Sequence, residues 1–297
     1  MPRADSTTGT RPDREANTDP KATPATVILL VRHGTTATTG TKLPGRAPGL
    51  HLAESGRRQA ADVAARIVRL TTRARDADHA PPAGNGTTPG DSGTGTDADG
   101  TGTGRAGGPG TTAVPPDGPA PAPATPPAAH GGAEAPAAPG VAAVYSSPLE
   151  RTRETAAPIA QAVDRPVEID EALVELDVGE WTGIDLKEAR SRREWATIQR
   201  YPSGFRFPGG ESFLDMQTRM VEALDRLRAR HPGETVVAVS HADPIRAVVA
   251  HALGTHLDLF QRIVVSPCSL TAIVLGDEGP TVLSVNTTGE SSALVPS

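Results

Sequence analysis

The chain has 297 residues, a formal net charge of −6, one cysteine, 31 glycines and 29 prolines. This charge offers no electrostatic basis for binding nucleic acid or an anionic membrane, and a single cysteine excludes an internal disulfide and a cysteine-rich zinc site. The sequence also lacks a secretory signal and any run of about 18 apolar residues, so we expect a cytoplasmic protein without membrane contact.

The first half of the chain offers one strand, one helix and a long segment without core-forming residues. Residues 1–25 predict a disordered tail. Residues 27–31 are all apolar and predict a strand buried on both faces of a parallel sheet, and residues 54–75 have the apolar spacing of an amphipathic helix. Between 76 and 140 there is one valine and no leucine, isoleucine, methionine or aromatic residue. This composition predicts a disordered insertion within one domain of residues 26–290.

The second half alternates strands and helices and ends in a short tail at 291–297. Ser147 and Pro148 predict a helix cap and a first helical residue, and Ser212 with Asp215 approximates a capping box. Strands are predicted at 141–145, 166–169, 234–240, 270–275 and 281–285, and helices at 148–163, 185–199, 213–230 and 245–253. This order predicts an α/β fold, a three-layer α/β/α sandwich whose central sheet is mostly parallel with an antiparallel edge.

Three strand-to-helix junctions place guanidinium and imidazole groups at the carboxyl end of the predicted sheet. Arg32 and His33 follow the first strand, Arg151 lies near the start of the helix after the second, and His241 follows the strand at 234–240. In an α/β sheet these ends face the ligand crevice, so the side chains can converge although they are far apart in sequence. Guanidinium groups match phosphate oxygens, which indicates a phosphoryl site.

A metal site is the competing interpretation, since two histidines with Glu175 or Asp177 would satisfy a zinc or iron ligand count. The permanent charges of Arg32 and Arg151 raise the cost of binding a divalent cation, so we predict no metal and no other cofactor. A neutral nitrogen of His33 would instead attack phosphorus directly. Expulsion of an alkoxide needs a proton, for which Glu175 is the predicted donor and Asp177 the second choice.

Five ordered motifs, LVRHG, YSSPLERTRETA, ELDVGEWTG, PGGES and VSHADPIRAV, resemble the histidine phosphatase superfamily in its phosphoglycerate mutase-like branch. The resemblance covers about residues 26–75 and 141–290. The overall pattern of motifs is similar to that of an actinobacterial subgroup of phosphomutases or phosphatases. It implies a phosphorylated nucleophile at His33 and a proton donor at Glu175. The phosphate pocket that it implies consists of Arg32, Arg151 and His241.

Two positions depart from the family pattern, and two others are weaker candidates. Thr35 stands where many members have glutamate, and Thr39 stands where asparagine is frequent; its hydroxyl can still donate to phosphate. Arg46 is a candidate substrate contact, with a solvated loop arginine as the alternative. Glu211 either contacts the site or opens a helix, where a carboxylate is favoured anyway.

The predicted function is hydrolysis of a small phosphomonoester through a phosphohistidine intermediate. A phosphomutase is the nearest alternative, because it would use the same groups and return the phosphoryl group to the substrate before water enters. From another class, a catalytically silent module could bind a phosphorylated ligand, although binding alone needs no nucleophile.

Overall fold

The computed structural model describes residues 23–78 and 140–289. Nearly all of the predicted tail at 1–25 and of the insertion at 76–140, and the whole tail at 291–297, lie outside these residues. In the two described ranges, no helix is long and apolar enough to cross a membrane.

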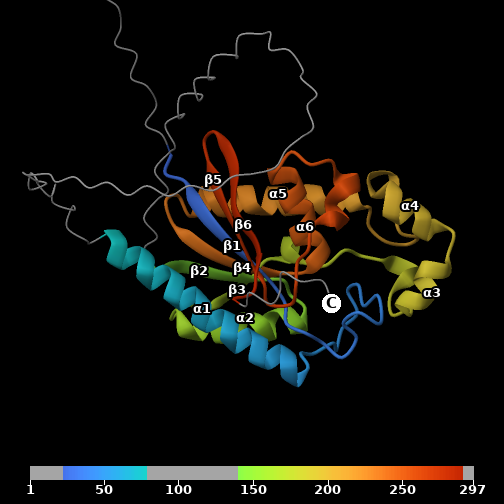
Figure 1. The fold of residues 1–297 in the computed structure, drawn as a ribbon, viewed down its shortest axis with the longest axis horizontal. Helices are drawn as coiled ribbons and strands as arrows, with labels where there is room; N and C mark the ends of the chain where they lie inside the picture. Colours follow the sequence, from blue (N-terminus) through green and yellow to red (C-terminus); the bar gives the residue numbers. More distant parts are fainter. Residues whose placement is uncertain (1–22, 79–139, 290–297) are drawn as a thin grey trace, which may run out of the picture. The chain divides into compact units, whose positions relative to one another are not determined.

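A sheet of six strands, in the order β3-β2-β4-β1-β5-β6, forms the centre of the described residues (Figure 1). The four strands β3, β2, β4 and β1 are parallel, whereas β5 is antiparallel to β1 and β6 to β5. The prediction of a mostly parallel sheet with an antiparallel edge is therefore confirmed. The strands are β1 (Thr26–Arg32), β2 (Val141–Ser146), β3 (Val167–Ile169), β4 (Thr235–Ser240), β5 (Leu270–Gly276) and β6 (Gly279–Thr287).

Helices cover both faces of this sheet, as the sandwich prediction requires. Figure 1 shows α1 (Glu54–Asp78) and α2 (Glu150–Ala162) on one side and α5 (Phe213–Arg230) and α6 (Ala242–Ala252) on the other. Successive residues of β1 pack alternately against the two helix layers. Ile28 and Leu30 belong to the core with α5 and α6, while Leu29 and Val31 belong to the core with α1 and α2. A strand buried on both faces needs a continuous apolar run, which is what the sequence has.

The single helix predicted at 185–199 is wrong, because the structure has two short helices there. They are α3 (Leu186–Ser191) and α4 (Glu194–Arg200), and Arg192 between them is extended. Ala189 and Ile198 both enter a third core cluster, which contains Trp181. In one continuous helix, residues nine apart would point to opposite sides at 3.6 residues per turn. The break lets both side chains pack into the same cluster.

Two helix starts also differ from the predictions, and both bear on the site. α2 begins at Glu150 after an extended Leu149, so neither Ser147 nor Pro148 has its predicted role. α6 begins earlier than predicted, at Ala242, with His241 as its cap residue. The capping box at the start of α5, by contrast, is present as predicted.

Candidate active site

His33 follows β1 directly and is almost completely buried. Its Nδ1 donates to the carbonyl oxygen of Gly34 at 2.7 Å, and because a carbonyl can only accept, Nε2 is left with the lone pair. Burial lowers the pKa of His33 to about 3, and the nearby positive charges of Arg151 and Arg32 act in the same direction. The imidazole is therefore neutral near neutral pH, as a nucleophile must be.

His241 lies beside His33, with ring centroids 5.1 Å apart and ring planes 62° apart. Its side chain is fully buried, and its Nε2 lies 2.9 Å from the hydroxyl oxygen of Ser147. Its Nδ1 has no hydrogen-bond partner among the described residues. Burial, together with the charge of Arg151, places the pKa of His241 well below its usual range.

Arg151 is fully buried and Arg32 is partly buried, and neither forms an ion pair with a carboxylate in the part of the chain that the structure describes. Arg32 donates to the carbonyl oxygen of Val265 at 2.7 Å, and Arg151 donates to that of Gly45 at 2.8 Å. Nε of Arg32, and Nε and Nη1 of Arg151, have no hydrogen-bond partner there. Burial lowers the pKa of both guanidinium groups. Unpaired buried donors are costly, and a phosphoryl anion would satisfy them.

Glu175 approaches the histidine pair from the loop after β3. One carboxyl oxygen, Oε2, lies 3.8 Å from Nδ1 of His241, and Oε1 accepts a hydrogen bond from the amide of Leu176. Burial, more than the repulsion by Asp243, raises the pKa of Glu175 to about 7, although the charges of Arg151 and Arg32 oppose the shift. Near neutral pH this carboxyl group can both give and take a proton.

Asp177, the second choice for the proton donor, lies in a more exposed position. One of its oxygens accepts from the amide of Gly179 at 2.9 Å, and the other lies 3.9 Å from Nη1 of Arg46. Within the described residues no cluster of three or more histidine, cysteine or carboxylate side chains could hold a metal ion.

The three weaker candidates form no hydrogen bond or ion pair with either histidine in the described residues. Thr39 bonds within its own loop, where its hydroxyl oxygen accepts from the amide of Thr36 at 2.9 Å. Arg46 and Glu211 form an ion pair at 2.9 Å, and Arg46 Nε donates to the carbonyl oxygen of Glu175 at 2.8 Å. Glu211 also accepts from the amide of Asp177 at 3.4 Å, so both residues contact the loop that holds the carboxyl group.

Sequence reasoning missed two residues of this region. Ser147 bonds to His241, but its position before Pro148 made it look like a helix cap. Arg219, on α5, pairs with Glu211 at 2.7 Å and donates to the carbonyl oxygen of Glu175 at 3.2 Å. No sequence signal separates Arg219 from the other arginines of the same helix.

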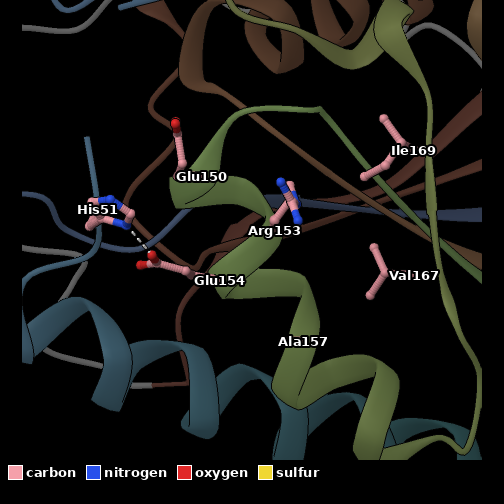
Figure 2. A pocket seen from close by; sticks show the side chains of 7 residues that line it. All are labelled: His51, Glu150, Arg153, Glu154, Ala157, Val167 and Ile169. Atoms are coloured by element: carbon pink, nitrogen blue, oxygen red, sulfur yellow. Dashed lines mark hydrogen bonds and ion pairs between the residues drawn. The ribbon is translucent and has the colours of Figure 1, made fainter. Parts of the chain in front are cut away.

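A separate cavity of about 540 Å³ lies beside α2, and Figure 2 shows its lining. Glu150 accepts from the amide of Gly49, and Glu154 accepts from the amide of Leu52 and contacts the ring of His51. These contacts tie the loop that contains Gly45 to α2. The cavity thus borders the loop that supports Arg151, and its lining does not include the histidine pair.

A family model described as the histidine phosphatase superfamily (branch 1) matches residues 28–75 and 128–288. A bifunctional protein of Mycobacterium tuberculosis is 36% identical over 156 residues, which make up 50% of this chain and 42% of that protein. Phosphoserine phosphatase 1 of Hydrogenobacter thermophilus is 33% identical over 155 residues, which are 49% of this chain and 70% of that protein.

The solved structure of a phosphoserine phosphatase from Entamoeba histolytica superposes with a TM-score of 0.61 at 19% identity, covering 89% of this chain and 98% of that one. At this identity the likeness concerns the fold. The chain spans less than half the length of the mycobacterial relative.

Proposed function

We propose that this chain, which belongs to the histidine phosphatase superfamily (branch 1), is a metal-independent phosphatase that hydrolyses a small phosphomonoester through a phosphohistidine. The observation that supports this proposal most directly is the pairing of a neutral, buried His33 with a second imidazole 5.1 Å away. Two guanidinium groups accompany this pair, and each has buried donor nitrogens without a partner in the described residues. Positive charge for the transferring oxygens is then available from the side chains themselves.

In the first step, Nε2 of His33 attacks phosphorus and forms a P–N bond while the P–O bond to the leaving group breaks. Glu175 in its acid form gives its proton to the departing oxygen, so an alcohol leaves instead of an alkoxide. Arg32, Arg151 and His241 hold the phosphoryl oxygens by donating hydrogen bonds.

In the second step, the carboxylate of Glu175 takes a proton from water, and the oxygen of that water attacks phosphorus. The P–N bond breaks, inorganic phosphate forms and His33 regains its lone pair. A pKa of Glu175 of about 7 suits both directions of proton transfer, because neither form is rare near neutral pH.

Rapid quench with a ³²P-labelled phosphomonoester tests this proposal. We expect an acid-labile, base-stable label on the wild-type protein and none on His33→Ala. His251→Ala, which changes an exposed histidine in the last turn of α6, is the matched control and keeps the label. A silent binding module would give no covalent label in any variant.

A substrate panel without added metal then addresses the chemistry of the leaving group. The name of the relative from Hydrogenobacter thermophilus makes O-phosphoserine the first compound to test, beside a sugar phosphate and a phosphoglycerate. Release of inorganic phosphate without an isomeric product supports hydrolysis. Formation of an isomeric phosphate ester that depends on a bisphosphate primer would support the mutase instead.

A further inference from the structure

We propose that Arg219 is a positioning residue for the Glu175 carboxyl group, an inference that rests on the proposed function. Arg219 lies on α5, and its guanidinium group binds three backbone or side-chain partners at once. Nη1 donates to the carbonyl oxygen of Ala172 at 2.7 Å, and Nη2 donates to that of Glu175 at 3.2 Å. Nε and Nη2 also form a two-point contact with the carboxylate of Glu211, at 2.7 and 3.0 Å.

Glu211 extends this arrangement to a second guanidinium group. Its Oε2 accepts from Nη2 of Arg46 at 2.9 Å, while Nε of Arg46 donates to the Glu175 carbonyl oxygen at 2.8 Å. Two guanidinium groups, joined by one carboxylate, therefore hold a single backbone oxygen. The side chains of Glu211 and Arg219 are only 13% and 19% exposed, so water screens these charge-assisted bonds less than it would on the surface.

The backbone around Glu175 depends on these contacts because its side chain has few of its own. The only hydrogen bond of that carboxyl group in the described residues comes from the adjacent amide of Leu176. Its place opposite His241 is thus set by where the main chain runs. Arg219 fixes that main chain at residues 172 and 175, and Glu211 accepts from the amide of Asp177 at 3.4 Å.

Charge alone does not explain the role of Arg219. The charged groups that shift the pKa of Glu175 most are Asp243, Arg151 and Arg32, whereas the charge of Arg219 helps to lower the pKa of His241. A lysine at 219 would keep the positive charge but could not bind Glu211 and both carbonyl oxygens with one planar fork. Arg219 should therefore affect the reaction through the position of the Glu175 carboxyl group. A shift of about 1 Å in a catalytic group can cost a factor of about 100 in rate.

The experiment compares an alkyl phosphate with p-nitrophenyl phosphate in Arg219→Gln, Arg219→Lys and Glu211→Gln. The aryl leaving group departs without a proton, so kcat/KM for it does not need a well-placed acid. We expect each variant to lose a factor of about 10 to 100 in kcat/KM for the alkyl phosphate and less than about 3 for the aryl phosphate. Arg226→Gln, an exposed arginine on the same helix that pairs with Asp170, should change neither value.

An equal loss with both substrates, or no loss with the alkyl phosphate, would overturn the role of Arg219. Thermal melting checks that each variant folds. If Arg219→Gln does not fold, Glu211→Gln decides, because it removes the carboxylate that joins Arg219 to Arg46 without removing a cation. Glu175→Gln separates this inference from the proposed function. If Glu175→Gln leaves the ratio of the two kcat/KM values unchanged, the proposed acid is wrong; if only the Arg219 and Glu211 variants leave it unchanged, the positioning role alone is wrong.

Discussion

The carboxyl oxygen Oε2 of Glu175 lies 3.8 Å from Nδ1 of His241, but the two groups do not form an ordinary ion pair. Burial keeps the pKa of His241 well below its usual range, so its imidazole is neutral. Burial also raises the pKa of Glu175 to about 7, so near neutral pH much of the carboxyl group is protonated. The contact therefore brings an acid next to a neutral ring, which is what the proposed protonation of the leaving group requires.

The first prediction is a pH dependence with two limbs. For an alkyl phosphate, kcat/KM should fall as pH rises through about 7, because Glu175 loses the proton that the leaving group needs. It should also fall as pH drops toward about 3, because His33 then gains a proton and loses its lone pair. The measurement is kcat/KM against pH, corrected for the ionisation of the substrate itself.

An aryl phosphate is the control for this profile, since its leaving group needs no proton. We expect it to lack the alkaline limb, and we expect Glu175→Gln to remove that limb for the alkyl phosphate. If both substrates show the same alkaline limb in the wild-type protein, another group causes it.

A second prediction concerns Ser147, whose hydroxyl group is the hydrogen-bond partner of His241 in the described residues. Ser147→Ala leaves both ring nitrogens of a buried imidazole unpaired, which should cost about 1–3 kcal/mol of unfolding free energy. The ring would also lose its orientation, so kcat/KM should drop about tenfold for alkyl and aryl phosphates alike. Urea unfolding and steady-state kinetics measure the two effects.

Thr71→Ala is the matched control for Ser147→Ala. It removes another buried hydroxyl group, one that donates to the carbonyl oxygen of Ile67 within α1. It should lower stability without changing kcat/KM. An unchanged kcat/KM in Ser147→Ala would show that the hydroxyl group does not orient the ring for the reaction.

The part of the site that the sequence predicted consists of residues placed by strand ends. Arg32 ends β1, His33 follows it and His241 follows β4, and neighbouring parallel strands bring their carboxyl ends to one edge. The complete strand order did not have to be known for this, because two adjacent parallel strands give the same convergence wherever they lie in the sheet. The family inferred from the five motifs is confirmed.

The other features of the site and the fold depend on tertiary contacts that no local sequence pattern encodes. Arg219 pairs with Glu211 only because α5 packs beside the loop that contains Glu175. The break between α3 and α4 follows from the need of Ala189 and Ile198 to enter one cluster, which is a tertiary constraint that overrides helical propensity.

A third prediction separates stability from ligand binding at Arg151. This side chain is fully buried, and two of its nitrogens have no hydrogen-bond partner in the described residues. Arg151→Met removes those unpaired donors, so the protein without ligand should become more stable by roughly 1 kcal/mol. It should also lose its response to phosphate, whereas about 100 Kd of phosphate stabilises a binding-competent protein by about 2.7 kcal/mol.

Thermal melting with and without inorganic phosphate measures both effects. Arg153→Met changes an exposed arginine on the same helix and should retain the phosphate response. A melting temperature of Arg151→Met that still rises with phosphate would mean that Arg151 does not bind the anion.

The last prediction uses two glycines of one loop that share a backbone strain but differ in their surroundings. Gly179 and Gly183 have φ of +49° and +83°, a region that L side chains rarely adopt. A Cβ at Gly179 would lie 2.2 Å from the carbonyl oxygen of Pro208, while a Cβ at Gly183 would have no atom within 4 Å. Both alanine variants therefore pay about 1–2 kcal/mol for the left-handed backbone, but only Gly179→Ala must also move the chain.

That movement of the chain should also displace the carboxyl group of Glu175. The amide of Glu180 donates to the carbonyl oxygen of Pro208 at 2.9 Å, so this contact joins the loop after Glu175 to the segment before Glu211. Gly179→Ala should therefore reduce kcat/KM for an alkyl phosphate well beyond the reduction in Gly183→Ala, with less effect on an aryl phosphate. Because the two variants share the backbone strain, equal kinetics in both would mean that close packing of the loop against Pro208 does not position Glu175.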